Sequence, residues 1–424
     1  MNTFDDIIGY QPEKEEIMRL ADAWKNPQKY RALGVEIPRA VLLYGEPGVG
    51  KTLFANALIE ASGLPCLTCR KNSSDGAFVA AIAQTFTDAA ESSPSIVFLD
   101  DMDKFAEDNL QQDSNKEEFA TVQSCMERVR EQNVFVVATA NDICNLPASL
   151  MREGRFGRRV LLTVPGRGDA ERIIAHYLHG KNVTSDVTAG MLAVILDGCS
   201  CAVLESVVNE AGLSAGYEGQ TEIGRTHLIR AVLRVLMHAT KKNADPCVRT
   251  YAAYHEAGHA LTALALGRRV GLVSIFGSGE RGGVCTVADS EHPSRDMADY
   301  LDKTVIALGG KAAIEVRFGQ ADVGCHRDLD IVVEQLRPVM TQCCAAGFAY
   351  GYDHDSWEGR QAPLRVERIS DKLYATIEEC CNRAKAVLTA RRPLLDAVAE
   401  ALLQNDALLE DDLSRLVAAY PVET

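Results

Sequence analysis

The sequence predicts an α/β domain with a doubly wound parallel sheet, followed by a mostly α-helical remainder. Three short apolar runs, residues 40–44, 95–99 and 134–138, are typical of buried parallel strands, and helical patterns separate them. A sheet of this kind binds its ligand at the carboxyl ends of the strands. Residues 166–243 and 366–418 carry the spacing of amphipathic helices.

Length and composition exclude several classes of protein. A chain of 424 residues suggests about three domains, and 47% apolar residues can fill their cores. The net charge of −15 argues against a nucleic-acid-binding protein, which would present a basic face. We find neither a signal peptide nor an apolar run long enough for a transmembrane helix.

Thirteen cysteines are scattered without the spacing of a disulfide framework. Adjacent pairs such as Cys343-Cys344 suit reduced thiols better than disulfides. Cys66 and Cys69 form a single C-x-x-C, for which a buried strand end is a simpler explanation than a redox or metal site.

A phosphate-binding loop follows the first predicted strand. Residues 45–52 match G-x-x-x-x-G-K-[ST] between a strand and a helix, the setting that this motif requires. Its backbone N–H groups close around phosphate oxygens, Lys51 supplies charge to the β- and γ-phosphates, and the Thr52 hydroxyl is a Mg²⁺ ligand. We expect every residue of the loop to contact the nucleotide: Gly45, Glu46, Pro47, Gly48, Val49, Gly50, Lys51 and Thr52.

Polar residues follow the other two predicted strands. Asp100 and Asp101 come directly after residues 95–99, and an acid at such a strand end can hold Mg²⁺ directly or through water. Asn141 follows residues 134–138, where it can orient the attacking water or sense the γ-phosphate.

His255, Glu256 and His259 form an H-E-x-x-H motif inside a predicted helix at residues 250–266. Two histidines four residues apart leave the same face of a helix, and two neutral imidazoles suit Zn²⁺. The glutamate can then take a proton from a metal-bound water. The competing interpretation is two solvated histidines on an alanine-rich helix. A zinc hydrolase needs a third protein ligand, and the residues alone leave many candidates.

The order of these motifs resembles the FtsH family of ATP-dependent zinc proteases. The likeness runs from about residue 3 to about residue 418 and includes residues 4–9, 34–38, 150–156 and 254–259. It implies an α/β P-loop AAA+ ATPase domain at 1–165, a helical lid at 166–243 and a zinc metallopeptidase domain at 248–424. It also implies an ATP-dependent zinc metalloendopeptidase that threads unfolded or misfolded polypeptides into its zinc site.

The resemblance assigns roles to residues in the nucleotide half. Asp100 matches the Walker B aspartate, and Asn141 matches the first sensor. Arg152 and Arg155 match arginine fingers, which reach the γ-phosphate in a neighbouring subunit and so imply a homo-oligomer, a hexameric ring. Ile8 and His176 match residues that bind the nucleotide, although His176 could equally be a partly buried helix residue.

In the protease half, Asp328 matches the third zinc ligand of the family, and His326 is a rival for that place. Zinc on His255, His259 and Asp328 would polarise the scissile carbonyl. Glu256 would take the proton of the attacking water and pass it to the leaving amine. Residues 273–276 form a short strand pattern, which is either an edge strand that pairs with an extended substrate or a plain core strand.

Several features depart from the family. Asp101 stands where the family has a glutamate that polarises the attacking water, and a misplacement of about 1 Å can cost about 10²-fold in rate. Ala140 and Gly157 replace a usual threonine and aspartate. The expected pore loop lacks its aromatic–apolar–Gly trio, and only Phe78 could substitute, although it more simply packs.

The family's amino-terminal membrane anchor is also missing from this chain. We therefore expect a cytoplasmic protein, or a membrane-associated one if the chain is a fragment of an anchored protein. The departures leave an alternative function open, a zinc peptidase whose weak or non-hydrolysing AAA+ domain serves as a nucleotide-stabilised assembly scaffold. The intact zinc motif disfavours a third possibility, a remodelling ATPase without protease activity.

Overall fold

The computed structural model describes residues 4–71, 77–106, 115–237, 241–242, 245–277, 282–289, 296–321, 324–341, 343–347 and 363–421. The chain forms two compact units. The first is Met1–His176 with Cys199–Glu205, and the second is Tyr177–Gly198 with Ser206–Thr424. Helix α8 (Cys201–Tyr217) begins in the first unit and continues in the second. The predicted three-domain division, with its lid at residues 166–243, stays a prediction.

A five-stranded parallel sheet forms the centre of the first unit. Its strands lie in the order β2 (Cys66–Cys69), β3 (Ser95–Leu99), β4 (Val134–Ala140), β1 (Ala40–Tyr44) and β5 (Arg158–Leu161). The three apolar runs of the sequence are its central strands, β3, β4 and β1, so the predicted sheet is confirmed. The phosphate loop, Asp100 and Asn141 therefore follow the carboxyl ends of neighbouring strands.

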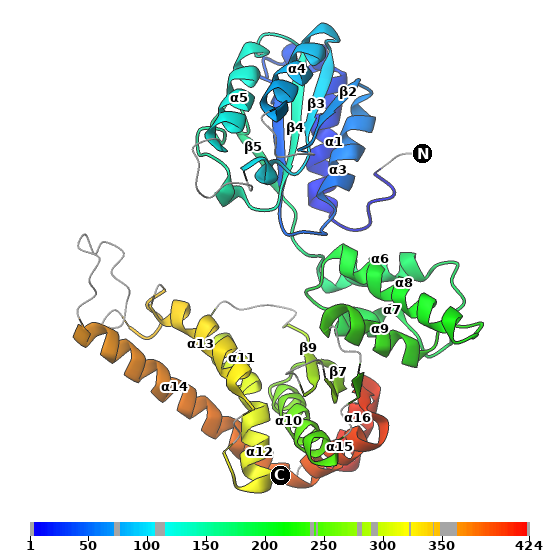
Figure 1. Ribbon diagram of the computed structural model, residues 1–424, viewed down its shortest axis with the longest axis vertical. Helices are drawn as coiled ribbons and strands as arrows, with labels where there is room; N and C mark the ends of the chain where they lie inside the picture. Colours follow the sequence, from blue (N-terminus) through cyan, green and yellow to red (C-terminus); the bar gives the residue numbers. More distant parts are fainter. Residues whose placement is uncertain are drawn as a thin grey trace. The chain divides into compact units, whose positions relative to one another are not determined.

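Helices cover both faces of this sheet (Figure 1). α1 (Gln11–Lys25) and α3 (Lys51–Ser62) pack on one face, and α4 (Ala77–Glu91) and α5 (Asn115–Arg128) pack on the other. Leu42 of β1 joins the core beneath α4 and α5, whereas its neighbours Val41 and Leu43 join the opposite core. Both faces of each central strand are thus buried, which is why these strands are uniformly apolar. The shorter elements of the unit are α2 (Pro27–Arg31), η1 (Met102–Ala106), η2 (Ile143–Asn145) and α6 (Arg167–Leu178), the last two residues of which fall in the second unit.

Two sequence interpretations concern side chains of the first unit. Phe78 on α4 is 7% exposed, and its ring packs edge-on against Phe105 with centroids 4.8 Å apart. The packing interpretation of Phe78 is therefore confirmed. Cys66–Cys69 forms β2, so the predicted strand is confirmed, but Cys69 is buried while Cys66 is exposed.

The second unit is mostly helical. Its helices are α7 (Ala189–Ile195), α9 (Arg225–Met237), α10 (Pro246–Ala265), α11 (Met297–Ala307), α12 (Gly309–Phe318), α13 (His326–Thr341), α14 (Pro363–Ala390), α15 (Arg392–Asn405) and α16 (Glu410–Ala419). Its strands are β6 (Lys241–Lys242), β7 (Val270–Ser274), β8 (Phe276–Gly277), β9 (Val284–Val287) and β10 (Ala407–Leu409).

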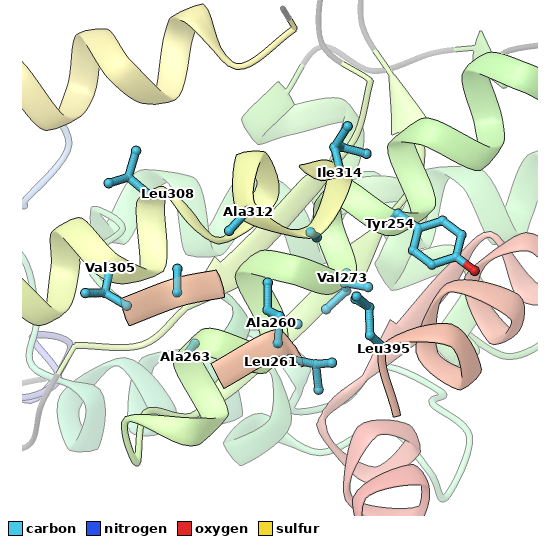
Figure 2. Close-up of a cluster of buried hydrophobic side chains, with 14 of the residues drawn as sticks. Tyr254, Ala260, Leu261, Ala263, Val273, Val305, Leu308, Ala312, Ile314 and Leu395 are labelled. Carbon is cyan, nitrogen blue, oxygen red and sulfur yellow. The ribbon is translucent and has the colours of Figure 1, made fainter. Parts of the chain in front are cut away.

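Helix α10 runs through the core of this unit and carries the H-E-x-x-H motif. Asp245 caps its start by accepting a hydrogen bond from the amide of Cys247 over 2.8 Å, with Pro246 in the first turn. Gly267 ends the helix with φ +73°, as the sequence predicts. The buried side chains around α10 come from β7, α11, α12, α15 and the junction of α11 with α12: Val273, Val305, Leu308, Ala312, Ile314 and Leu395 (Figure 2).

Helices α10 and α12 touch through glycine backbones. A Cβ atom on Gly258 would lie 2.2 Å from the backbone oxygen of Gly309, and one on Gly309 would lie 2.6 Å from that of Gly258. Any side chain at either position would therefore push the helices apart. This contact brings the start of α12 against the helix face that carries the two histidines.

A three-stranded antiparallel sheet in the order β10-β7-β9 packs beside α10. β7 pairs on both sides and is buried along its whole length. Of the predicted strand at residues 273–276, Val273 and Ser274 lie in β7, so the substrate-binding edge strand is wrong for them and the core-strand alternative is correct. Phe276 begins β8, which pairs with β6. Among the described strands, β9 is an edge of the three-stranded sheet.

Candidate active sites

The structure brings His255, His259 and Asp328 together in the second unit. The Nε2 atoms of the two histidines lie 3.1 Å apart. Oδ2 of Asp328, from the first turn of α13, lies 3.1 Å from Nε2 of His255 and 3.4 Å from Nε2 of His259. Among the described residues, these three form the group of His, Cys, Asp and Glu side chains that could hold a metal ion, with ligand atoms within 4.8 Å of one another.

The donor atoms of this group fit zinc. His259 donates from Nδ1 to the backbone oxygen of Ile306 over 2.8 Å, and because a carbonyl can only accept, Nε2 keeps its lone pair. Oδ2 of Asp328 is buried and faces the Nε2 atoms of both histidines. Burial opposes its ionisation, yet the two imidazoles outweigh this effect and hold the pKa of Asp328 well below its usual range. Two nitrogens and one carboxylate oxygen are ligands that catalytic zinc accepts.

Gly310 keeps space open beside the ligands. A Cβ atom built there would lie 2.6 Å from Nε2 of His255 and 2.6 Å from Nε2 of His259. The space that faces both nitrogens is therefore open because residue 310 has no side chain. The predicted rival ligand His326 lines the same cleft but is exposed, and it is not a member of the three-residue group.

Glu256 is buried beside the two histidines, with 6% of its surface exposed. Burial raises the pKa of Glu256, while the neighbouring imidazoles of His259 and His255 oppose the rise. A Cβ atom on Gly283 would lie 2.7 Å from Oε1 of Glu256, so the backbone before β9 closes against the carboxyl group. A carboxyl group beside the candidate metal ligands is placed for proton transfer.

A cleft of about 800 Å³ opens onto these residues. α10 and the start of α13 contribute the three candidate ligands and Glu256, and the segment that leads into β9 contributes Gly282, Gly283 and Val284. Its volume lies within the range of small-molecule and peptide binding sites.

In the first unit, the phosphate loop is folded around its own lysine. Lys51 is 6% exposed and donates from Nζ to the backbone oxygens of Gly45 and Glu46, each over 2.8 Å. Gly45 has φ +145°, and a Cβ atom there would lie 1.9 Å from the backbone oxygen of Leu162, so only glycine fits. Burial lowers the pKa of Lys51, and Asp101 opposes this effect.

The predicted Mg²⁺ residues lie together. Oδ1 of Asp100 accepts a hydrogen bond from Thr139 over 2.9 Å and lies 3.4 Å from the hydroxyl of Thr52. Asn141 lies at the end of β4 and donates from Nδ2 to Oδ2 of Asp103 over 2.9 Å. Sequence reasoning missed Asp103. Asp103 lies three residues after Asp100 in the 3-10 turn η1, which returns it towards the strand ends. This spacing is the sequence feature that could have indicated it.

The remaining predicted residues differ in their surroundings. Arg155 donates to the backbone oxygen of Ser149 over 2.5 Å and forms an ion pair with Glu127. Arg152 is exposed, and no partner for its side chain is found in the described part of the chain. Ile8 is half-buried, and His176 is exposed in the last turn of α6. The nucleotide roles of these four residues stay predictions.

Comparison with known proteins identifies both units. Residues 41–164 match the ATPase family associated with various cellular activities (AAA), and residues 243–416 match peptidase family M41. The chain is 31% identical to the ATP-dependent zinc metalloprotease FtsH of Thermus thermophilus, over 99% of this chain and 71% of that protein. It is also 31% identical to the ATP-dependent zinc metalloprotease FtsH 3 of Sphaerobacter thermophilus, over 99% of this chain and 88% of that protein.

The family matches confirm the predicted fold class, an AAA ATPase followed by a helical metallopeptidase. No helix in the described ranges has the length and apolar character needed to span a bilayer. The chain belongs to the FtsH family of ATP-dependent zinc metalloproteases and has Zn²⁺ and ATP, with Mg²⁺, as cofactors.

Proposed function

We propose that this enzyme cuts unfolded or misfolded polypeptides at the group formed by His255, His259 and Asp328, and that ATP hydrolysis drives their delivery. The observation that carries the proposal is the cleft of about 800 Å³ that holds these three residues beside Glu256. The opening is large enough for a segment of extended chain, and every side chain that peptide hydrolysis needs lies on it.

Glu256 performs the proton transfers of this reaction. Zinc held by the three ligands supplies a Lewis acid that polarises the scissile carbonyl. Glu256 takes a proton from the attacking water and delivers it to the leaving amine. Glu256 is buried beside the two histidines and lines the same cleft, which places it to make both transfers.

The substrate backbone binds along β9. Gly283, Val284 and Cys285 line the cleft together with Glu256, and β9 is an edge among the described strands of its sheet. An extended peptide can add to such an edge through backbone hydrogen bonds, which every sequence offers. This mode of binding favours unfolded polypeptides over folded ones and imposes little side-chain selectivity.

The ATPase half works in a ring of identical subunits, which we take to be a hexamer. The exposed Arg152, without a partner in the described part of its own chain, can reach the nucleotide of a neighbouring subunit. Phe78 is packed against Phe105 and does not grip the substrate. Residues 72–76 of the predicted pore loop lie outside the described residues. Thirteen free cysteines favour a reducing compartment, such as the cytoplasm.

The test is hydrolysis of an unfolded model protein by the purified, zinc-loaded enzyme. Reactions contain no nucleotide, ATP or a non-hydrolysable ATP analogue, and released phosphate is counted alongside, with Glu256→Gln as the inactive control. We expect cleavage to require hydrolysable ATP. Equal cleavage with ATP and the analogue would show that nucleotide only holds the assembly together, and the coupled function would then be rejected.

A further inference from the structure

Asp101, the residue after the Walker B aspartate, forms ion pairs with two cationic side chains. Oδ2 of Asp101 lies 2.9 Å from Nζ of Lys104 and 3.4 Å from Nη2 of Arg70. The backbone of Asp101 is in the left-handed region with φ 54°, and its amide donates to the hydroxyl of Thr139 over 2.8 Å. Because the short Asp101 carboxylate is already paired with Lys104 and Arg70, it is poorly placed to polarise the water that attacks the γ-phosphate.

A second carboxylate lies close by in a different environment. Asp103 is 4% exposed, and its Oδ2 accepts the 2.9 Å hydrogen bond from Nδ2 of Asn141. Its Oδ1 is buried and has no hydrogen-bond partner among the described residues. A buried carboxylate with an unsatisfied oxygen is costly, so its presence next to Asn141 needs an explanation.

The hydrogen bond fixes the orientation of the Asn141 amide. Only the NH₂ group of Asn141 can donate to a carboxylate, so its carbonyl oxygen points the other way and can accept a hydrogen bond from water. Asn141 follows β4 directly, at the end of the sheet that carries the phosphate loop. A water molecule held by that carbonyl oxygen is oriented for attack on a bound γ-phosphate.

We propose that Asp103 is a positioning residue for ATP hydrolysis, acting through Asn141, and that Asp101 serves as a counter-ion of Lys104 and Arg70. In the reaction, the water oxygen bonds to the γ-phosphorus as the bond to the β,γ-bridging oxygen breaks. ADP leaves with the electron pair of that bond, and the proton of the water passes to the released phosphate. The inference rests on the proposed ATP-driven function.

The test measures kcat for phosphate release and the Kd for ATP in matched variants of the full chain. Asp103→Ala and Asn141→Ala should each lower kcat about 10²-fold, with ATP affinity within about threefold of the unsubstituted enzyme. Asp103→Asn keeps one oxygen that accepts from the Asn141 amide, so its kcat should stay within about tenfold. Asp101→Asn should also stay within about tenfold, since that carboxylate does not contact the water.

The double variant Asp103→Ala/Asn141→Ala separates a shared role from two independent ones. Residues that act as a unit lose their effect once, so its kcat should match the worse single variant; a loss near 10⁴-fold would overturn the inference. It would also fail if Asp103→Asn were as slow as Asp103→Ala, or if Asp101→Asn were the slowest single variant. If the unsubstituted enzyme released no phosphate, both this inference and the proposed ATP-driven function would be rejected.

Discussion

The imidazole of His259 donates from Nδ1 to the backbone oxygen of Ile306 over 2.8 Å. Ile306 belongs to the last turn of α11, so a helix that carries no candidate ligand sets the tautomer and the ring plane of one. The acceptor is a main-chain oxygen, which is present whatever side chain residue 306 carries. Substitution of Ile306 by another apolar residue should therefore leave this hydrogen bond in place.

Gly310→Ala should weaken zinc binding. Its new Cβ atom would lie 2.6 Å from Nε2 of both histidines, closer than real contacts allow, so either the imidazoles or α12 must move and the ligand geometry is disturbed. We expect zinc affinity to fall at least ~10-fold, measured by metal content after dialysis against a weak chelator. Gly216→Ala is the matched control, since a Cβ atom there meets nothing within 4 Å. Full zinc content in the Gly310→Ala enzyme would contradict the placement of the metal between these residues.

Glu256→Gln should separate zinc binding from catalysis. Glutamine has nearly the same shape but cannot take a proton, so we expect zinc content to be unchanged and cleavage of a short peptide to fall by about 10²- to 10⁴-fold. His259→Ala, by contrast, should lose both zinc and cleavage. Substantial cleavage by the Glu256→Gln enzyme would remove this residue as the proton acceptor.

How much of the site could be predicted depends on whether the signal is local. His255, Glu256 and His259 share one helix, and the spacing of four residues alone places the two histidines on the same face of it. Asp328 comes from another helix, and only the family resemblance pointed to it. The role proposed for Gly310 depends on how closely α12 approaches α10, which no pattern in either helix reveals.

The strand at residues 273–276 shows the same limit for the fold. Its apolar pattern predicts a strand, and its first two residues form the end of β7. Whether it is an edge or a central strand depends on β10, which is formed by Ala407–Leu409 far along the chain. A short apolar run carries no information about such a distant partner, so the edge hypothesis could not be excluded from the sequence.

Lys51→Ala should weaken ATP binding. The Nζ atom of Lys51 is held by the backbone oxygens of Gly45 and Glu46, at the turn of the loop that would enclose the phosphates. Removal of this charge should lower ATP affinity at least ~10-fold, measured by titration with a fluorescent nucleotide. Lys25→Ala at the exposed end of α1 is the control for loss of a lysine elsewhere. Unchanged affinity in the Lys51→Ala variant would count against the phosphate-loop assignment.

Substitutions of Arg152 and Arg155, the two predicted arginine fingers, should have different effects. Arg152 is exposed and has no partner in the described part of its chain, whereas Arg155 is bound to Ser149 and Glu127. Arg152→Ala should therefore lower ATP turnover about 10³-fold, with ATP affinity and thermal stability unchanged. Arg155→Ala should lower the melting temperature as well, because it removes a hydrogen bond and an ion pair from its own fold.

Mixing two inactive variants tests whether Arg152 acts on a neighbouring subunit. Lys51→Ala subunits bind ATP poorly but still offer Arg152, and Arg152→Ala subunits bind ATP but offer no arginine. In a mixed ring, an intact phosphate loop can face an intact arginine, so phosphate release should rise above that of either variant alone. If the mixture stays as slow as its components, Arg152 does not act between subunits. A ring could then still form, but the arginine would have to act within its own chain.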